Sequence, residues 1–208
     1  MMSRAYYILQ PIWHYFKCIL IMRTEIGRNI KKGFASFGKG TIIYKPLLQM
    51  SGIDKVSIGS NTTILKGARL AVYGEKKNVN PTIEIGDNCY LGFGISILAH
   101  SSSTIRIGND VLFASNILIT NENHGINPEN EVPYMNQDLS AKPIEIGDGC
   151  WIGEKVCILP GVNIGKKSIV GAGSVVTKSI PAYSIAVGNP AKIIKKYNFD
   201  HKKWESEN

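Results

Sequence analysis

The sequence lacks the features of a membrane-spanning, secreted or disulfide-linked protein. Its longest apolar stretch, from Ala5 to Met22, is interrupted by Pro11, His14 and Lys17, which argues against a transmembrane span. No small-residue cleavage site follows this stretch, so we expect no secretory signal peptide. The four cysteines include no C-x-x-C pair, and we expect them to be reduced thiols in a cytoplasmic protein.

Acidic residues are also few, but the resulting positive charge does not indicate a nucleic-acid partner. The chain has 24 Lys and Arg against 16 Asp and Glu, a formal net charge of +8. The basic residues concentrate near the two ends, and no helix-turn-helix, zinc finger or stacking-sheet motif is present. A phosphorylated small molecule or an acidic lipid suits such local basic patches better.

What the sequence does contain is a six-residue periodicity. Large aliphatic residues recur at every sixth position in its C-terminal half: Ile146, Ile152, Ile158, Ile164, Val170 and Val176. Smaller or more slender residues occupy the fifth position of the same hexads: Cys150, Val156, Val162, Ser168, Ser174 and Ile180. Two inward positions per hexad indicate short strands, which must stack on copies of themselves to bury a face. The pattern predicts an all-β fold, a parallel β-helix with three hexads per triangular coil.

The same period recurs upstream in three shorter runs. These are Ile58, Ile64 and Leu70, then Ile85, Leu91 and Ile97, then Ile107, Phe113 and Ile119. The second and third runs are separated by four residues more than one coil, which predicts a bulge near 99–103. Ile119, the last residue of the third run, and Ile146 are 27 positions apart, which is nine more than the 18 residues of one coil. We therefore expect an extruded loop over about 125–143 that leaves the coil soon after His124.

The two ends differ from the repeats, so we divide the chain into a basic extension (1–40), a β-helix domain (41–190) and a basic tail (191–208). A helix is expected in the extension, because several residues would lie on one helical face: Ile8, Ile12, Phe16, Ile19 and Arg23. This helix either packs on the coil or a neighbouring subunit, which we favour, or lies on an anionic membrane surface. We expect a short helix in the tail.

The segment Ile146–Lys192, with its VGAGSVVTK corner and VGNPAK exit, closely resembles the end of the hexapeptide-repeat acyltransferases. The resemblance is to the sugar O-acetyltransferase branch related to galactoside and maltose acetyltransferases, and it covers about 58–197. It implies a left-handed β-helix, a homotrimer, and acetyl-CoA bound in the groove between adjacent subunits, with no metal. The handedness comes from the resemblance alone, because ordinary crossover connections are right-handed.

His124, in the motif ITNENHG at the mouth of the loop, resembles the catalytic histidine of this family. A neutral imidazole there would act as general base on an acceptor hydroxyl. Related enzymes often have Asp three residues earlier, where this chain has Asn121, so Glu122 or a backbone carbonyl is left to orient the ring, or Glu122 is simply solvated. The resemblance also implies that the amide of Gly153 is an oxyanion donor, and Glu154 replaces a serine of the galactoside enzymes.

The resemblance further implies a set of residues that bind acetyl-CoA: Trp151, Gly153, Ala172, Thr177, Lys178 and Lys192. Among them, Ala172 corresponds to a contact with the pantetheine arm, Thr177 and Lys178 to contacts with the adenine and phosphates, and Lys192 to a basic residue near the 3′-phosphate. Candidates for the acceptor-binding site are loop residues with aromatic or amide side chains: Asn123, Tyr134 and Asn136. His100 either helps to shape that site or is a surface histidine.

These expectations amount to a cytoplasmic enzyme, at most peripheral at the inner face of the membrane. It would transfer the acetyl group of acetyl-CoA to a hydroxyl of a sugar or polysaccharide precursor. N-acetylation of an amino sugar is the alternative, and a non-catalytic trimeric scaffold is a more distant one. Metal-dependent carbonic anhydrases share the β-helix but need three histidine ligands, whereas only His100 and His124 fall within the repeats here. We therefore expect no metal.

Overall fold

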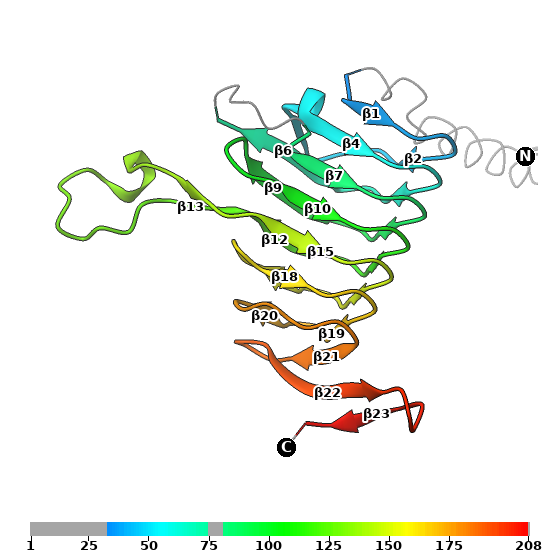
Figure 1. The fold of residues 1–208 in the computed structure, drawn as a ribbon. Coiled ribbons are helices and arrows are strands. Elements are labelled where there is room, and N and C mark those ends of the chain that lie inside the picture. The colour runs from blue at the N-terminus through cyan, green and yellow to red at the C-terminus, as the bar shows by residue number, and fades with distance from the viewer. Residues whose placement is uncertain (1–32, 75–80, 208) are drawn as a thin grey trace, which may run out of the picture.

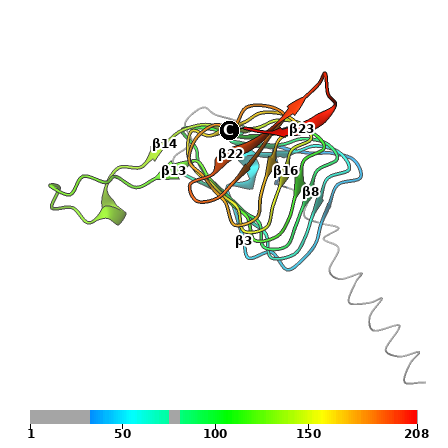
Figure 2. The same ribbon diagram turned by 90° about the horizontal axis from the view of Figure 1, so that it is seen from below.

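The computed structural model describes residues 33–74 and 81–207, which form a triangular prism of short parallel strands (Figures 1 and 2). In Figure 1 the strands at the front run from left to right, and the chain then passes behind them as it descends toward the C-terminus. This path is a left-handed coil. The left-handed parallel β-helix expected from the sequence is confirmed.

Each coil contributes one strand to each of three faces. Face 1 contains β1 (Ser36–Phe37), β4 (Val56–Ile58), β7 (Ile83–Ile85), β10 (Ile105–Ile107), β15 (Ile144–Ile146) and β18 (Asn163–Ile164). Face 2 contains β2 (Ile42–Ile43), β5 (Thr63–Ile64), β8 (Tyr90–Leu91), β11 (Leu112–Phe113), β16 (Trp151–Ile152), β19 (Ile169–Val170) and β21 (Ser184–Val187). Face 3 contains β3 (Gln49–Ser51), β6 (Arg69–Tyr73), β9 (Ser96–His100), β12 (Leu118–Thr120), β17 (Cys157–Ile158) and β20 (Val175–Val176).

The core lies inside the prism and is built by the residues that carry the six-residue period. All six aliphatic residues of the series from Ile146 to Val176 are buried, as are the residues of the three upstream runs. Parallel pairing aligns equivalent positions, so Ile107 pairs with Ile85 in the preceding coil and with Ile146 in the next. Side chains of the same kind therefore stack along the prism, and their burial is the main stabilising term.

The two expected departures from the coil are present, whereas the helical tail is not. The small bulge is a turn at 101–103 that follows β9. The C-terminal tail forms two antiparallel strands, β22 (Lys192–Asn198) and β23 (Lys203–Ser206), instead of a helix. The last coil would otherwise leave β21 with an open edge, and β22 covers that edge. The expected N-terminal helix falls on residues 1–32, which lie outside the described part of the chain.

The long loop leaves the prism as a projecting arm between β12 and β15 (Figure 1). A short antiparallel pair, β13 (Glu122–Asn123) and β14 (Ser140–Ala141), forms its base, and one 3-10 turn, η2 (Tyr134–Asn136), lies farther out. A second 3-10 turn, η1 (Ile53–Lys55), precedes β4. Over 33–74 and 81–207, no helix is long and apolar enough to cross a membrane.

Candidate active site

His124 lies at the base of the arm, on the edge of the prism where face 3 meets face 1. It directly follows β13, and its side chain is exposed. The pairing of Asn123 with Ser140 and the hydrogen bond from the Lys142 amide to the Asn121 carbonyl (2.9 Å) hold the two limbs of the arm together. The position of His124 is therefore set by a backbone pairing that begins where the coil ends.

A pocket of about 280 Å³ opens beside His124. Its lining residues come from both limbs of the arm and from the next coil: Asn123, His124, Gly125, Ile126, Ser140, Lys142 and Pro160. Of the residues singled out from the sequence, the pocket thus brings together His124 and Asn123. Sequence reasoning missed Ser140, Lys142 and Pro160, although the pairing of Ile119 with Ile158 places Pro160 beside the base of the arm.

Neither of the two nearby polar residues orients the His124 ring within the described part of the chain. The Asn121 side chain is buried and holds the backbone of His100, whose N–H donates to Oδ1 at 2.8 Å. Glu122 is half-buried, and its Oε2 is buried with no hydrogen-bond partner among residues 33–74 and 81–207. Because side chains alternate along a strand, Glu122 faces away from the side on which Asn123 lines the pocket.

The remaining candidates for the acceptor site lie elsewhere. Tyr134 and Asn136 belong to η2, are exposed, and do not line the pocket beside His124. His100 is half-buried on face 3, and its Nδ1 lies 2.7 Å from the Ser102 hydroxyl. One chain therefore does not gather the acceptor candidates into a single site.

Three of the predicted acetyl-CoA residues lie together on another part of the prism. Trp151 points outward from face 2 and is 50% exposed. Gly153 follows at the edge between faces 2 and 3, directly against Ala172 of the next coil. A Cβ at Gly153 would lie 2.6 Å from the Ala172 amide nitrogen, so only glycine allows the two coils to approach this closely. Ala172 itself is exposed at the same edge.

The amide of Gly153 is not available as an oxyanion donor, which corrects the expectation from the sequence. It donates a 2.8 Å hydrogen bond to the Val170 carbonyl as part of the ladder between coils. The six-residue period identifies inward side chains but does not show which amides the ladder consumes. The next amide, that of Glu154, has no hydrogen-bond acceptor within the described residues.

The remaining predicted acetyl-CoA residues are separated from this group. Thr177 and Lys178 are exposed on the same edge as His124, because Ile158 pairs with Val176 and the chain turns the corner directly afterwards. Lys192 is exposed at the start of β22, opposite Val187. Apart from Lys192 and the arm residues Tyr134 and Asn136, the candidate residues therefore form two groups, on two different edges of the prism.

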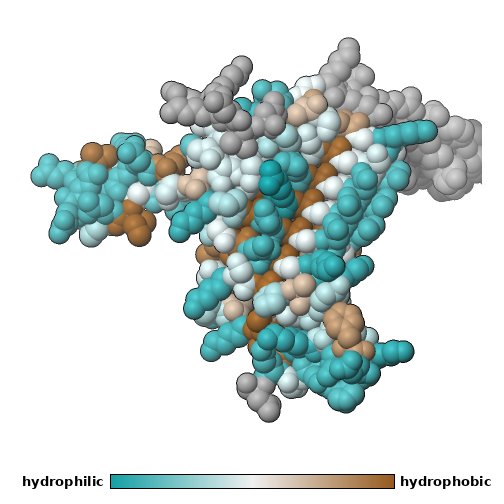
Figure 3. Space-filling view, viewed as in Figure 1, coloured by the Kyte–Doolittle hydropathy of each residue, from teal (hydrophilic) through white to brown (hydrophobic). Residues whose placement is uncertain are grey.

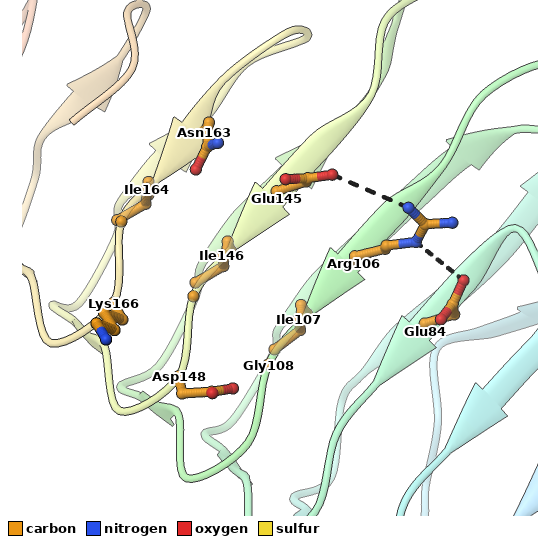
Figure 4. A pocket seen from close by; sticks show the side chains of 12 residues that line it. Glu84, Arg106, Ile107, Gly108, Glu145, Ile146, Asp148, Asn163, Ile164 and Lys166 are labelled. Atoms are coloured by element: carbon orange, nitrogen blue, oxygen red, sulfur yellow. Dashed lines mark hydrogen bonds and ion pairs between the residues drawn. The ribbon is translucent and has the colours of Figure 1, made fainter. Parts of the chain in front are cut away.

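A second, wider depression of about 540 Å³ lies on face 1 (Figure 4). Outward side chains from successive coils form a polar ladder beside it, in which Arg106 contacts Glu84 at 3.1 Å and Glu145 at 3.9 Å. Figure 3 shows hydrophilic side chains on this face of the molecule next to a continuous apolar stripe. All three side chains are more than a third exposed, so each ion pair contributes little to stability. No residue predicted for the site lines this depression.

Within the described residues, no metal site and no cysteine lies at the pocket beside His124. Among residues 33–74 and 81–207, no group of three His, Cys, Asp or Glu side chains is placed to hold a metal ion. Burial raises the pKa of the thiols of Cys89 and Cys150, and these cysteines lie inside the coil, away from the pocket.

Comparison with known proteins assigns the chain to a family. Residues 143–178 match the hexapeptide repeat of succinyl-transferase. A putative lipopolysaccharide biosynthesis O-acetyl transferase of Escherichia coli, WbbJ, is 38% identical over 156 residues, which cover 72% of this chain and 76% of WbbJ. This chain belongs to the hexapeptide-repeat acyltransferase family. A galactoside O-acetyltransferase of Lactococcus lactis is 34% identical over 171 residues, 78% of this chain and 77% of that enzyme.

Solved structures of the hexapeptide-repeat acyltransferases agree with this assignment. A maltose O-acetyltransferase from Clostridium difficile aligns with a TM-score of 0.52 and 28% identity, covering 80% of this chain and 71% of that one. An N-acyltransferase from Bacillus cereus, solved with dTDP and coenzyme A, aligns with a TM-score of 0.70 over 85% of this chain and 93% of that one. At 21% identity the second likeness supports the fold alone.

Proposed function

We propose that the protein is an acetyl-CoA-dependent O-acetyltransferase that acts in the cytoplasm on a hydroxyl of a sugar or polysaccharide precursor, with His124 as general base. The observation that carries this proposal is the composition of the pocket at the base of the arm. His124 is the lining residue with an imidazole, the side chain that most often acts as a general base. The similarity to sugar O-acetyltransferases supplies the donor and the class of acceptor.

In the proposed reaction, the acceptor hydroxyl gives its proton to the neutral imidazole of His124 as its oxygen attacks the thioester carbonyl. The carbonyl oxygen becomes an oxyanion in the tetrahedral intermediate. Collapse of this intermediate breaks the carbon–sulfur bond, and the thiolate of coenzyme A leaves with the proton held by His124. We assign stabilisation of the oxyanion to the Glu154 amide, which has no acceptor within the described residues and directly follows Gly153.

The separation of the two groups of residues supports an active site shared between copies of the chain. His124 and Thr177 lie on one edge, whereas Gly153 and Ala172 lie on another, with face 3 between them. A neighbouring copy that presents its own face 2 to the His124 edge would bring Trp151 beside the imidazole. Such a contact joins two different surfaces, and around a threefold axis it closes into a homotrimer.

Exposed apolar side chains support the same arrangement. Four coils of face 2 present an apolar side chain that is between 36% and 50% exposed: Ile42, Tyr90, Leu112 and Trp151. Thr63 occupies the same position on the coil between Ile42 and Tyr90. The arm presents a second apolar set that is between 38% and 84% exposed: Ile126, Val132, Tyr134, Met135 and Leu139 (Figure 3). Figure 2 shows the arm on the opposite side of the prism from β8 and β16, so the two sets do not meet within one chain. Contact between copies would bury both.

Within this proposal the other candidates keep specific roles. Tyr134 and Asn136 would reach the acceptor at a neighbouring copy, because the arm carries them away from their own His124. Lys178 and Lys192 would contact the phosphates of coenzyme A as exposed cations. Glu122, which makes no hydrogen bond to His124, would act on the ring only after a change in its side-chain position.

Coenzyme A release across a panel of sugars, with identification of the acetylated product, tests the proposal. His124→Ala should lower kcat by about 10²- to 10⁴-fold, the usual contribution of a general base, and leave coenzyme A affinity unchanged. His201→Ala is the matched control, because His201 is exposed in the C-terminal hairpin and should have wild-type activity. Wild-type turnover by His124→Ala, or a product acetylated only on nitrogen, would contradict the proposal.

A further inference from the structure

The pocket beside His124 carries a single formal charge, and that charge is positive. Apart from the titratable His124, its polar lining residues are the amide Asn123, the hydroxyl Ser140 and the ammonium of Lys142. No carboxylate is among the residues that line it. An acceptor drawn into this pocket therefore meets a cation next to the proposed general base.

Lys142 is exposed, but its backbone amide and its aliphatic stem both contact neighbouring residues. Its amide donates to the Asn121 carbonyl at 2.9 Å, which fixes the backbone at the point where the arm rejoins the coil. Its aliphatic stem runs past Gly161 of the next coil, where a Cβ would lie 3.2 Å from the Lys142 Cδ. A side chain larger than hydrogen at Gly161 would therefore press on this stem.

The ammonium of Lys142 has no ion-pair partner among residues 33–74 and 81–207. The carboxylate on the facing strand of the hairpin is that of Glu122, which is paired with Ala141. Alternation along β13 and β14 puts Glu122 and Ala141 on one side, and Asn123, Ser140 and Lys142 on the other. The ammonium of Lys142 is thus exposed at the pocket, on the side away from Glu122, and has no ion pair among the described residues.

We propose that Lys142 selects an acceptor that bears an anionic group, a carboxylate or a phosphate, close to the hydroxyl that is acetylated. This inference rests on the proposed function, because it assumes that the hydroxyl lies at His124. The phosphates of coenzyme A cannot be the anionic group at Lys142. The thioester must lie at His124, and the whole pantetheine arm separates the phosphates from the thioester. The charge at Lys142 is therefore assigned to the acceptor and not to the donor.

Matched pairs of acceptors test this assignment. Glucose is compared with glucuronate and with glucose 6-phosphate, and galactose with galacturonate, in wild type and in Lys142→Gln. We expect the wild type to favour the anionic member of a pair by about 10- to 100-fold in kcat/KM, the usual range for a hydrogen bond to a charged group. Lys142→Gln should lose this ratio, and Lys142→Arg should retain most of it.

One control variant and three outcomes decide the test. Lys39→Gln removes an exposed lysine from a distant corner of the prism and should keep the wild-type ratio. Equal use of neutral and anionic acceptors by the wild type would overturn the inference, as would a Lys142→Gln variant that raises KM for acetyl-CoA while keeping the acceptor ratio. Failure of the wild type to acetylate any sugar would instead overturn the proposed function.

Discussion

The coil and the arm are held together in different ways. In the coil, backbone amides donate to carbonyls of neighbouring coils, and equivalent side chains stack in register inside the prism. In the arm beyond the β13–β14 pair, one side chain supplies the hydrogen bonds that a ladder would make. The carboxamide of Gln137 is buried and bonds both limbs: Nε2 donates to the carbonyls of Asn127 (3.1 Å) and Val132 (3.0 Å), and Oε1 accepts from the Asn127 amide (3.2 Å).

Because of this difference, we assign the stability of the protein to the coil and its proposed chemistry to the arm. The coil buries the aliphatic residues, so most of the free energy of folding belongs there. The arm buries little and carries His124 at its base, so it can change without unfolding the prism. Substitutions in the coil should therefore change the free energy of unfolding, whereas substitutions in the arm should change turnover.

The largest expected effect is on the coil. Ile105→Ala removes a fully buried side chain from β10 and should lower the free energy of unfolding by about 2–5 kcal/mol, from lost burial and the cavity left behind. Arg106→Ala, at the next and outward position of the same strand, should lower it by less than about 1 kcal/mol. Urea denaturation at one protein concentration measures both. Equal losses for the two variants would contradict the assignment of stability to inward positions.

The second prediction concerns the arm. Gln137→Leu keeps a similar volume but removes all three hydrogen bonds between the limbs, next to Gly125 and therefore next to His124. We expect kcat to fall by about 10- to 100-fold, because small displacements of a catalytic group are costly. The melting temperature should stay within about 2 °C of wild type, because the core is unchanged.

Glu131→Gln is the matched control for this prediction, since Glu131 is exposed on the same arm. It should change neither kcat nor the melting temperature. A Gln137→Leu variant that keeps full activity would show that the arm does not need its internal hydrogen bonds. A large loss of melting temperature in the same variant would show that the arm and the coil unfold as one unit.

The same contrast explains how much of the fold could be predicted from the sequence. Hexad spacing predicted the inward residues, the bulge after β9 and the loop before β15, because each depends on counting along the chain. The tail could not be predicted in this way. Residues 191–208 follow the last hexad, and their conformation depends on the open edge of β21, which exists only once the coil has formed.

Only the part of the candidate site where the chain leaves the coil could be predicted from the sequence. His124 was identified because the motif ITNENHG at the mouth of the loop resembles that of the family's catalytic histidine, and it shares one pocket with Asn123. Lys142 was missed because its place in that pocket depends on how the arm returns to the coil. Gly153 was misassigned as an oxyanion donor because its amide is consumed by the hydrogen bond to Val170, which a side-chain pattern does not show.

A further contrast within the coil is between the inward thiols of Cys89 and Cys150 and the outward thiol of Cys157. Cys89 and Cys150 occupy the fifth hexad position, are buried, and donate through Sγ to the carbonyls of Gly108 (3.1 Å) and Gly165 (3.2 Å). Cys157 lies on face 3 and is half-buried. The two buried thiols should therefore make the free energy of unfolding depend on pH.

The smallest expected effect follows from this contrast. Burial raises the pKa of the Cys89 and Cys150 thiols, so the folded protein holds these protons at pH values where the unfolded chain releases them. Their contribution to stability is then complete below the unfolded thiol pKa of about 8.5 and is lost as the pH rises through the raised folded values. Replacing both residues by Ala should flatten the decline in the free energy of unfolding between about pH 8 and about pH 10, measured by urea denaturation. Cys157→Ala, which replaces the half-buried thiol on face 3, is the comparison variant, and an equal flattening by it would show that the buried position of the other two thiols is not the cause.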